Sequence, residues 1–532
     1  MKLFTKLIGT AAIGVTMSLG APAAFAETPP NMLVMAMRID DITTADPAQS
    51  FEFTGMEMTR NIYGKLVNYD PLNLDAGYQP DLATEWDVSE DGKTISFTMR
   101  EGVTFHSGNP VTAEDAAYSL RRVIKLNKTP AFILTQFGFT PENVDEMIRV
   151  EDGKLLITTD RKYATSFVLN CLTAGVGAIV DMKTVEANAV DGDMGNTWLA
   201  TNTAGSGPYK LVSWKPNESY MLEANPDYYG GAPAMQRVVT RHVQESASQR
   251  LLLEAGDIDV ARNLNPEDVK AVDGNGDLDV YSALSGQVMY FAMGQKQPQF
   301  SNPKVVEAVK YLIDYHAMAD SFLAGEWAVH QNFLPATYMG SVDENPFKFD
   351  VEKAKALLDE AGVGPFEFEV GVREAQDRIE MAQSIQNTLA EVGITMNITL
   401  GTAKQILTRY RARDLDAYLG AWGPDYPDPQ TNAGTFAWNP DNSDEAKATG
   451  ILAWRNSWNP GELTQIVDDA KVEPDTSKRA AMYEEIQAIS RATSPIAVMF
   501  QRTERSGVAS NLKNWNLGGA VSEAGYFVVT KE

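Results

Sequence analysis

The sequence has few of the residues that build metal or covalent sites. It contains one cysteine, Cys171, within the apolar stretch 167–172. A lone thiol forms no intrachain disulfide, and in this setting we expect an inert, partly buried side chain. Four histidines are scattered along the chain: His106, His242, His316 and His330. None pairs with another at metal-binding spacing, so the sequence predicts no metal and no cofactor.

Positive charge is also scarce. Lys and Arg number 45 against 71 Asp and Glu, which gives a net charge of −26 at pH 7. Such a chain is repelled by phosphate backbones and by anionic lipid surfaces, so we expect no nucleic-acid partner. Hydrophobic residues make up 44% of the chain, which is the composition of a folded, water-soluble protein.

Long apolar runs are missing after the N-terminus. At the N-terminus, Lys2 and Lys6 precede an apolar stretch at 7–19, and Ala24-Phe-Ala26 follows as a small-residue cleavage site. This order predicts a signal peptide at 1–26, and the stretch is too short for a comfortable membrane span. No cysteine stands near the cleavage site to carry a lipid. We therefore expect a soluble, exported protein of the periplasm.

Sequence signatures of catalysis are missing as well. There is no Gly-x-Ser-x-Gly elbow, no His-Glu-x-x-His and no recognisable Cys/His motif. Asp425 and Asp428 are three residues apart beside two prolines, and that spacing does not predict a glycosidase pair. We predict a binding protein rather than an enzyme. An exported hydrolase, or a ligand sensor or chaperone with the same fold, remains the alternative.

The residues that are present predict mixed α/β structure. Strands at 85–88 and 94–99 flank a turn at 89–92 and form a hairpin, and Thr112 begins a helix with an apolar stripe. Asp350 starts a second helix that ends at Gly362. Further elements are expected as follows: strands at 209–214, 220–223, 238–243, 366–370 and 396–400, and helices at 246–255 and 379–392. No linker separates these segments, so the domains are expected to interlace.

Several motifs resemble one family in sequence order. They are Asn61-Ile-Tyr-Gly-Lys-Leu-Val-Asn-Tyr-Asp70, Pro80-Asp-Leu-Ala-Thr-Glu-Trp-Asp-Val-Ser-Glu-Asp-Gly92, Arg100-Glu-Gly-Val-Thr-Phe-His106, Pro110-Val-Thr-Ala-Glu-Asp115, Gly205-Ser-Gly-Pro-Tyr209, Asn225-Pro-Asp-Tyr-Tyr-Gly-Gly231, Tyr311-Leu-Ile-Asp-Tyr315 and Trp422-Gly-Pro-Asp-Tyr-Pro-Asp-Pro429. Together they are similar to the extracytoplasmic solute-binding proteins of family 5, the peptide/nickel class that serves ABC importers.

This resemblance implies an α/β, two-lobed periplasmic binding protein, class II-like and of the large cluster C type, with an extra α/β domain inserted near the N-terminus. Lobe I would comprise 27–57, 204–284 and 500–532, the extra domain 58–203, and lobe II 285–499. The expected partners are a small peptide-like ligand and the permease subunits of an ABC importer. We expect a monomer. The family also takes oligosaccharides, opines and metal complexes, so the ligand class stays open.

The resemblance places the ligand site at the motif that begins with Trp422. Asp425 follows a predicted strand, where ligands bind in α/β lobes, and in peptide-binding relatives the Asp at this position holds the ligand's amino group. Trp422 and Tyr426 are expected as companions, whereas Asp428, between two prolines, is typical of a rigid turn. Some relatives carry an Arg three residues before the Trp, where this chain has Leu419.

The ligand carboxylate therefore needs another basic partner. Arg409 and Arg373 are the substitutes we expect to bind it; Arg411 and Arg413 are further candidates.

Overall fold

The computed structural model describes residues 28–73, 77–517 and 523–532. The predicted signal peptide lies outside this described part. An 11-stranded sheet runs through the molecule, with strand order β15-β14-β16-β12-β17-β11-β1-β10-β9-β8 and β13 paired to β17. Its strands are β1 (Met32–Met37), β8 (Tyr209–Lys215), β9 (Ser219–Ala224), β10 (Arg237–His242), β11 (Val260–Ala261), β12 (Leu278–Met293), β13 (Trp327–Val329), β14 (Phe366–Arg373), β15 (Ile394–Gly401), β16 (Ala417–Trp422) and β17 (Ile496–Ala509).

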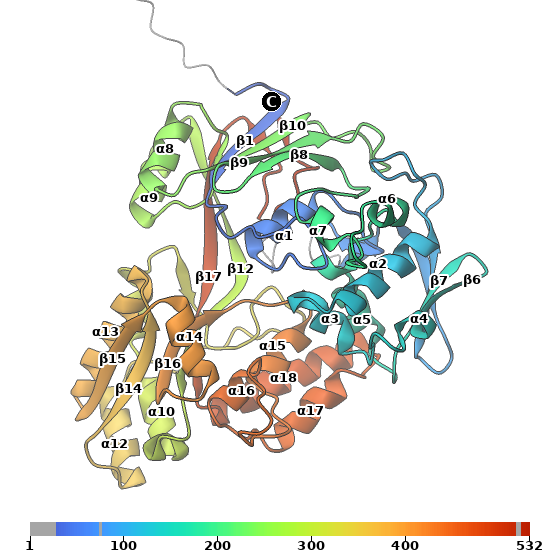
Figure 1. Cartoon of the computed structure of the whole chain (residues 1–532). Helices are drawn as coiled ribbons and strands as arrows, with labels where there is room; N and C mark the ends of the chain where they lie inside the picture. Colours follow the sequence, from blue (N-terminus) through green and yellow to red (C-terminus); the bar gives the residue numbers. More distant parts are fainter. Residues whose placement is uncertain (1–27, 74–76, 518–522) are drawn as a thin grey trace, which may run out of the picture.

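Two long strands connect the upper and lower halves of this sheet. In Figure 1, β1 and β8–β10 lie above, β14–β16 lie below, and β12 and β17 run between them. The antiparallel ladder of β12 and β17 is interrupted between Leu284 and Val288. There the buried Gln501 side chain accepts from the Ala336 N–H and donates to the Ser285 carbonyl, at 3.0 and 2.8 Å. The expected lobe boundaries, 284/285 and 499/500, lie on these strands.

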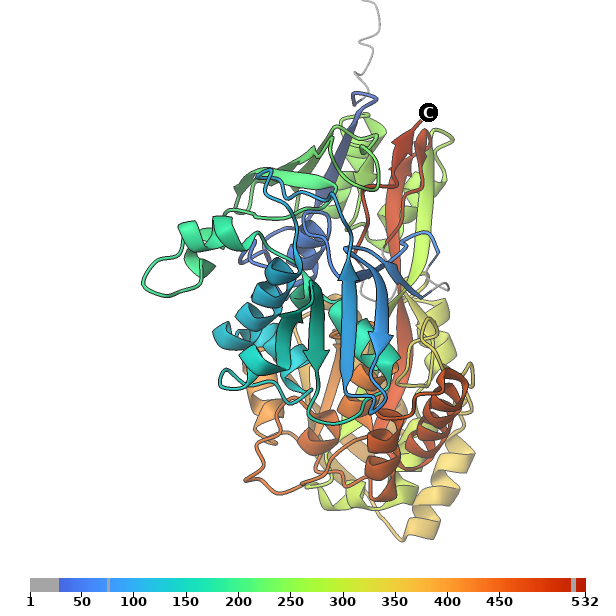
Figure 2. The same ribbon diagram turned by 90° about the vertical axis from the view of Figure 1, so that its right-hand side faces the viewer.

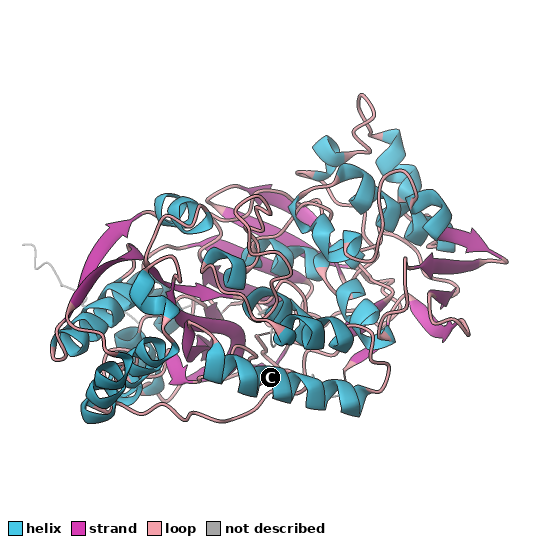
Figure 3. Cartoon of the chain, turned by 90° about the horizontal axis from the view of Figure 1, so that it is seen from below, coloured by secondary structure: helices cyan, strands magenta, loops and turns pink. Residues whose placement is uncertain are grey.

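Lobe II is layered because its sheet is apolar on both faces. Met289, Phe291 and Met293 of β12 face one core, and Val288 and Tyr290 face the other. Helices cover both faces (Figure 3). They are α10 (Pro303–Tyr311), α11 (Tyr315–Asp320), α12 (Val351–Ala361), α13 (Gln376–Ala390), α14 (Ala403–Arg411), α15 (Pro429–Phe436), α16 (Leu452–Arg455), α17 (Glu462–Ala470) and α18 (Thr476–Thr493).

The strands of lobe I also have side chains that alternate between the two faces of the sheet. Leu33, Met35 and Met37 of β1 enter one core, while Val34 and Ala36 enter the other. Its helices are α1 (Phe53–Arg60), α8 (Ser246–Glu254) and α9 (Pro266–Asp273). Close to the C-terminus, β18 (Leu512–Lys513) pairs with β19 (Thr530–Lys531).

The extra domain is built on a four-stranded sheet, β4-β5-β7-β6, which Figure 2 shows in front. Its strands are β4 (Ala83–Val88), β5 (Thr94–Met99), β6 (Ile148–Glu151) and β7 (Lys154–Thr158), beside the pair β2 (Val67–Tyr69) and β3 (Tyr78–Pro80). Its helices are α2 (Ala113–Leu126), α3 (Phe132–Thr135), α4 (Val144–Met147), α5 (Thr165–Leu172), α6 (Met182–Ala187) and α7 (Asn196–Leu199).

The local predictions are confirmed in most details. The hairpin forms as β4 and β5, and Thr112 begins α2 with a reciprocal capping box to Asp115. Asp350 caps α12, which ends at Gly362 with φ +65°, a conformation that favours glycine. The crossover β14-α13-β15 is parallel, although α13 ends at Ala390, before the predicted Val392.

The extra domain contacts both lobes through buried polar groups. Arg122 of α2 forms an ion pair of 2.6 Å with Asp46, with both side chains buried. On the other side, Asn170 of α5 donates to Asp428 at 2.7 Å, and the Ala164 N–H donates to the Lys471 carbonyl. Cys171, beside Asn170, is fully buried rather than partly buried as expected, and burial raises the pKa of its thiol.

Candidate functional site

A pocket of about 170 Å³ lies between residues expected for lobe I and residues expected for lobe II. It brings together the ends of β1 and β11, helix α1, the interrupted stretch of β12 and β17, and the loop after β16. Its lining residues are Met37, Arg38, Phe53, Thr54, Glu57, Arg262, Asn263, Ser285, Gln287, Gly423, Pro424, Arg502 and Glu504. The pocket is therefore flanked by the predicted motif at 422–429.

The motif loop approaches lobe I closely at one point. A Cβ on Gly423 would lie 3.1 Å from the ring of Phe53 in α1, so a glycine permits this contact. Trp422, the last residue of β16, is partly buried, and its ring meets Phe436 edge-on at 5.7 Å. These contacts fix the loop between the core of lobe II and the facing helix.

Asp425 has an unusual carboxyl group. Its side chain is partly buried, and its backbone N–H donates to Thr431 Oγ1 at 3.2 Å. Among the residues that the structure describes, none donates a hydrogen bond to its carboxylate or forms an ion pair with it. Burial raises the pKa of Asp425 to about 7, and Arg455 opposes that rise. A carboxylate that is desolvated but has no protein partner is poised to accept a donor from a ligand.

Three arginines lie at the same edge of lobe II. Arg373 ends β14, Arg378 is in the first turn of α13, and Arg455 ends α16; all three side chains are partly buried. None forms an ion pair within the described ranges. Burial and the neighbouring Arg373 lower the pKa of the Arg378 guanidinium, and its buried Nε has no hydrogen-bond partner. We call these three residues the arginine cluster.

Tyr418 lies between the arginine cluster and the motif that begins with Trp422. The ring of Tyr418 in β16 stacks on Tyr410 at 4.1 Å and lies along its strand over Gly420. A Cβ on Gly420 would be 2.2–2.3 Å from the ring edge and hydroxyl of Tyr418, so only glycine fits there. Burial raises the pKa of Tyr418, and the charges of Arg378, Arg373, Arg455 and Arg411 oppose this rise.

The predicted site residues are thus only partly brought together. Trp422 and Asp425 flank Gly423 and Pro424, which line the pocket, and Arg373 ends the neighbouring strand β14. Arg409 is instead held by Glu369, through two bonds of 2.7 and 2.8 Å, and by Asp414 at 3.0 Å. Tyr426 is buried against Phe167 of the extra domain, with the ring centroids 6.1 Å apart. A ligand contact by either of these two stays a prediction.

The remaining candidates have structural partners or lie in solvent. Arg413 pairs with Asp444 at 2.8 Å, whereas Arg411 is exposed. Sequence reasoning did not select Arg378 or Arg455, because neither adjoins a motif. The signal for Arg378 was its place just after a strand end, in the first turn of a helix.

Asp428 belongs to a separate, fully buried network, as its turn position indicated. Its oxygens accept four hydrogen bonds: two from Arg479, one from Asn170 and one from the Gln430 N–H, all at 2.7–2.9 Å. Arg479 uses its remaining donors on Tyr483, the Ala470 carbonyl and Ser166. This network joins the motif loop to α18 and to the extra domain.

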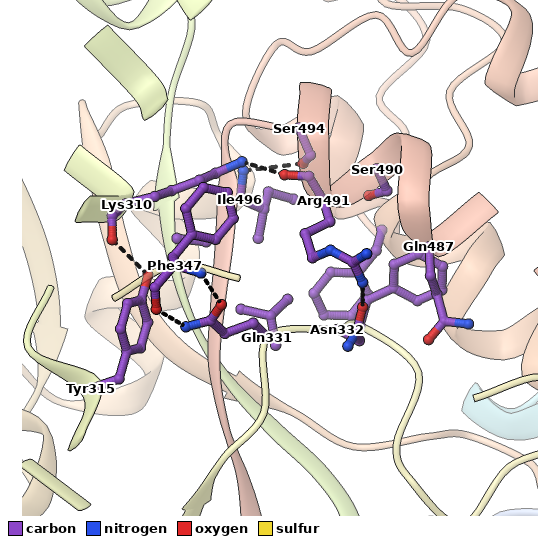
Figure 4. A pocket seen from close by; sticks show the side chains of 14 residues that line it. Lys310, Tyr315, Gln331, Asn332, Phe347, Gln487, Ser490, Arg491, Ser494 and Ile496 are labelled. Atoms are coloured by element: carbon purple, nitrogen blue, oxygen red, sulfur yellow. Dashed lines mark hydrogen bonds between the residues drawn. The ribbon is translucent and has the colours of Figure 1, made fainter. Parts of the chain in front are cut away.

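A second cavity inside lobe II has room for little more than one water molecule, at about 20 Å³ (Figure 4). Lys310 lines it and donates to the Arg491 carbonyl at 2.8 Å. Burial lowers the pKa of Lys310 to about 7. Across the described residues, no group of His, Cys, Asp and Glu side chains is arranged to hold a metal ion, and no helix could cross a membrane.

Comparison with known proteins assigns the chain to a family. The family model of the bacterial extracellular solute-binding proteins, family 5 (middle), matches residues 77–444, and the chain belongs to this family of binding proteins. It is 26% identical to the probable D,D-dipeptide-binding periplasmic protein of Escherichia coli (strain K12), over 94% of this chain and 95% of the relative.

Solved structures confirm the two-lobed α/β fold. HbpA2 from Haemophilus parasuis superposes with a TM-score of 0.80 at 20% identity, covering 94% of this chain and all of that structure. The periplasmic binding protein DppA from Helicobacter pylori, in complex with the peptide STSA, superposes with a TM-score of 0.76 at 23% identity, covering 94% and 98% of the two chains.

Proposed function

We propose that this protein captures a peptide-like solute with a free amino group between its two lobes and delivers it to the permease of an ABC importer. It would act as a monomer in the periplasm, after removal of residues 1–26. The relatives named for dipeptide binding and the neighbour crystallised with a peptide support this ligand class. Oligosaccharides, opines and metal complexes are the other classes that a ligand screen would reveal.

The observation that carries the proposal is the unpartnered carboxylate of Asp425. A protonated amine would supply the hydrogen bonds that this carboxylate lacks, and the closed gap would strengthen the charged contact by excluding water. The arginine cluster, at the same strand ends, would bind the ligand's carboxylate in place of the relatives' arginine at the Leu419 position.

The experiment is a thermal-shift screen of dipeptides and tripeptides on the mature protein, followed by calorimetry on each hit. Asp425→Asn removes the negative charge without changing the side-chain size. We expect it to weaken the binding of a peptide by about 30-fold or more, because a buried charge pair loses one member. The same peptide, recovered intact after incubation, would argue against the exported-hydrolase alternative.

Two controls make the result specific. Asp441→Asn changes an exposed carboxylate of the same lobe and should leave affinity unchanged. N-acetylation of the peptide removes the ammonium and should abolish the difference between the parent protein and Asp425→Asn. Equal affinity of the parent protein for acetylated and free peptide would refute the assignment.

A further inference from the structure

Positive charge gathers at one edge of lobe II, although the whole protein carries −26. Arg455 lies near the unpartnered carboxyl group of Asp425, Arg373 ends the strand next to β16, and Arg378 follows in the first turn of α13. Ion pairs satisfy most buried arginines elsewhere, including Arg122, Arg262 and Arg479, each held by a carboxylate at 2.6–2.8 Å. The arginine cluster therefore departs from the pattern of this protein.

The backbone register fixes where these guanidiniums lie. Val372 of β14 is paired with Leu419 of β16, so the next residue, Arg373, stands alongside Gly420, over which the Tyr418 ring lies. Arg455 lies 5.3 Å from the centre of the Tyr410 ring, which stacks on Tyr418. Arg373 and Arg455 thus lie beside one aromatic platform at the carboxyl ends of β14 and β16, and Arg378 stands five residues beyond Arg373 in the first turn of α13.

The facing wall adds no free negative charge. In the pocket, Arg262 is balanced by Glu57 at 2.8 Å and lies 3.9 Å from Glu504. Arg38 and Arg502 are exposed there, and neither forms an ion pair with a described residue.

The carboxyl groups that adjoin this region are engaged locally. Asp41 accepts from the Thr54 N–H, and Asp377 accepts from the Arg378 N–H. Asp377 offsets part of the charge of Arg378, but neither carboxyl group forms an ion pair with a guanidinium of the described residues.

We propose that the cargo is a net anion, a peptide-like solute with a second acidic group besides its terminal carboxylate. This inference rests on the proposed function. A dipeptide with neutral side chains brings one ammonium for Asp425 and one carboxylate for one guanidinium. The other guanidiniums would then be enclosed without an anionic partner, which is unfavourable in a gap that excludes water. A second carboxylate removes this imbalance through charge-assisted, two-pronged hydrogen bonds.

The test compares Ala-Glu with Ala-Gln by calorimetry, because the two dipeptides have the same shape and differ in one negative charge. We expect Ala-Glu to bind at least about tenfold more tightly, the difference between a charged and a neutral hydrogen bond. In Arg378→Gln this preference should disappear while the affinity for Ala-Gln is kept. Arg241→Gln, which changes an exposed arginine of β10, is the matched control and should keep the preference.

The outcomes separate this inference from the proposed function. If Ala-Gln binds as tightly as Ala-Glu, the inference is wrong and the proposed function stands. The inference is equally wrong if Arg378→Gln and Arg373→Gln both keep the full preference for Ala-Glu. If no peptide of the screen binds to the folded protein, the proposed function and the inference both fall.

Discussion

The buried pair of Asp428 and Arg479 allows a sharp prediction about stability. Both side chains are fully buried, and the network around them satisfies every guanidinium N–H of Arg479 and four acceptor positions of Asp428. Asp428→Asn keeps the side-chain volume but turns an acceptor into a donor that faces other donors. It also leaves the charge of Arg479 buried without a counter-charge.

We expect Asp428→Asn to lose about 3–5 kcal/mol of unfolding free energy, because it removes one member of a buried ion pair. For a domain of the size of lobe II, this corresponds to a melting temperature lower by about 6–20 °C. Differential scanning calorimetry and urea unfolding monitored by tryptophan fluorescence would measure it. The double variant Asp428→Asn/Arg479→Met should recover part of the loss, since it removes the stranded charge.

The matched control is Asp145→Asn, which breaks a pair with Lys125 at 2.8 Å, against 2.7 Å for the buried pair. The side chains of Asp145 and Lys125 are 59% and 32% exposed. It should cost less than about 1 kcal/mol, because water screens exposed pairs. The reasoning is refuted if the two single variants lose the same stability. It is also refuted if Arg479→Met lowers stability as much in the Asp428→Asn variant as it does in the parent protein.

Two further predictions concern the site. Burial raises the pKa of Asp425 to about 7, so the carboxyl group of the free site gains a proton as the pH falls below 7. The affinity for an amine-bearing peptide should therefore fall by up to about tenfold per pH unit below 7. Calorimetry should show that Asp425→Asn has lost this pH dependence. Gly420→Ala should lower the free energy of unfolding by about 1–3 kcal/mol and weaken peptide binding, because the new Cβ would lie 2.2 Å from the Tyr418 ring. Gly434→Ala is the control, since its Cβ would have its nearest contact at 3.4 Å. Urea unfolding should show its stability unchanged or higher.

Local structure could be predicted because its determinants are neighbours in sequence. Ile95 and Phe97 alternate with polar residues, and both are buried in the core of the extra domain. Thr112 and Asp350 begin helices because a hydroxyl or carboxylate at that position accepts an otherwise free backbone N–H. The lobe boundaries came from the family resemblance and remain a prediction, since strand pattern alone does not reveal that β12 and β17 serve two lobes.

The site was harder to predict because its parts meet only through the topology. Arg378 and Arg455 are separated by much of lobe II in the chain, and both act on Tyr418 only because the fold sets β14 beside β16. Arg409 was selected for its position, but Glu369 on the adjacent strand neutralises it, a long-range contact that the motif does not encode. Tyr426 was selected for its place beside Asp425, yet the alternation of the loop turns its ring into the core.

The interrupted ladder of β12 and β17 has a mechanical consequence. Regular pairing stops at Leu284 and resumes at Val288, and in the intervening backbone the Ser285 carbonyl accepts from Gln501 while the Gln287 N–H donates to Ser285 Oγ. We expect the two halves of the molecule to turn about this short stretch, because the paired strands on either side can stay intact. The bonds of Gln501 and the contacts of the extra domain with both lobes would resist this turn and together set its stiffness.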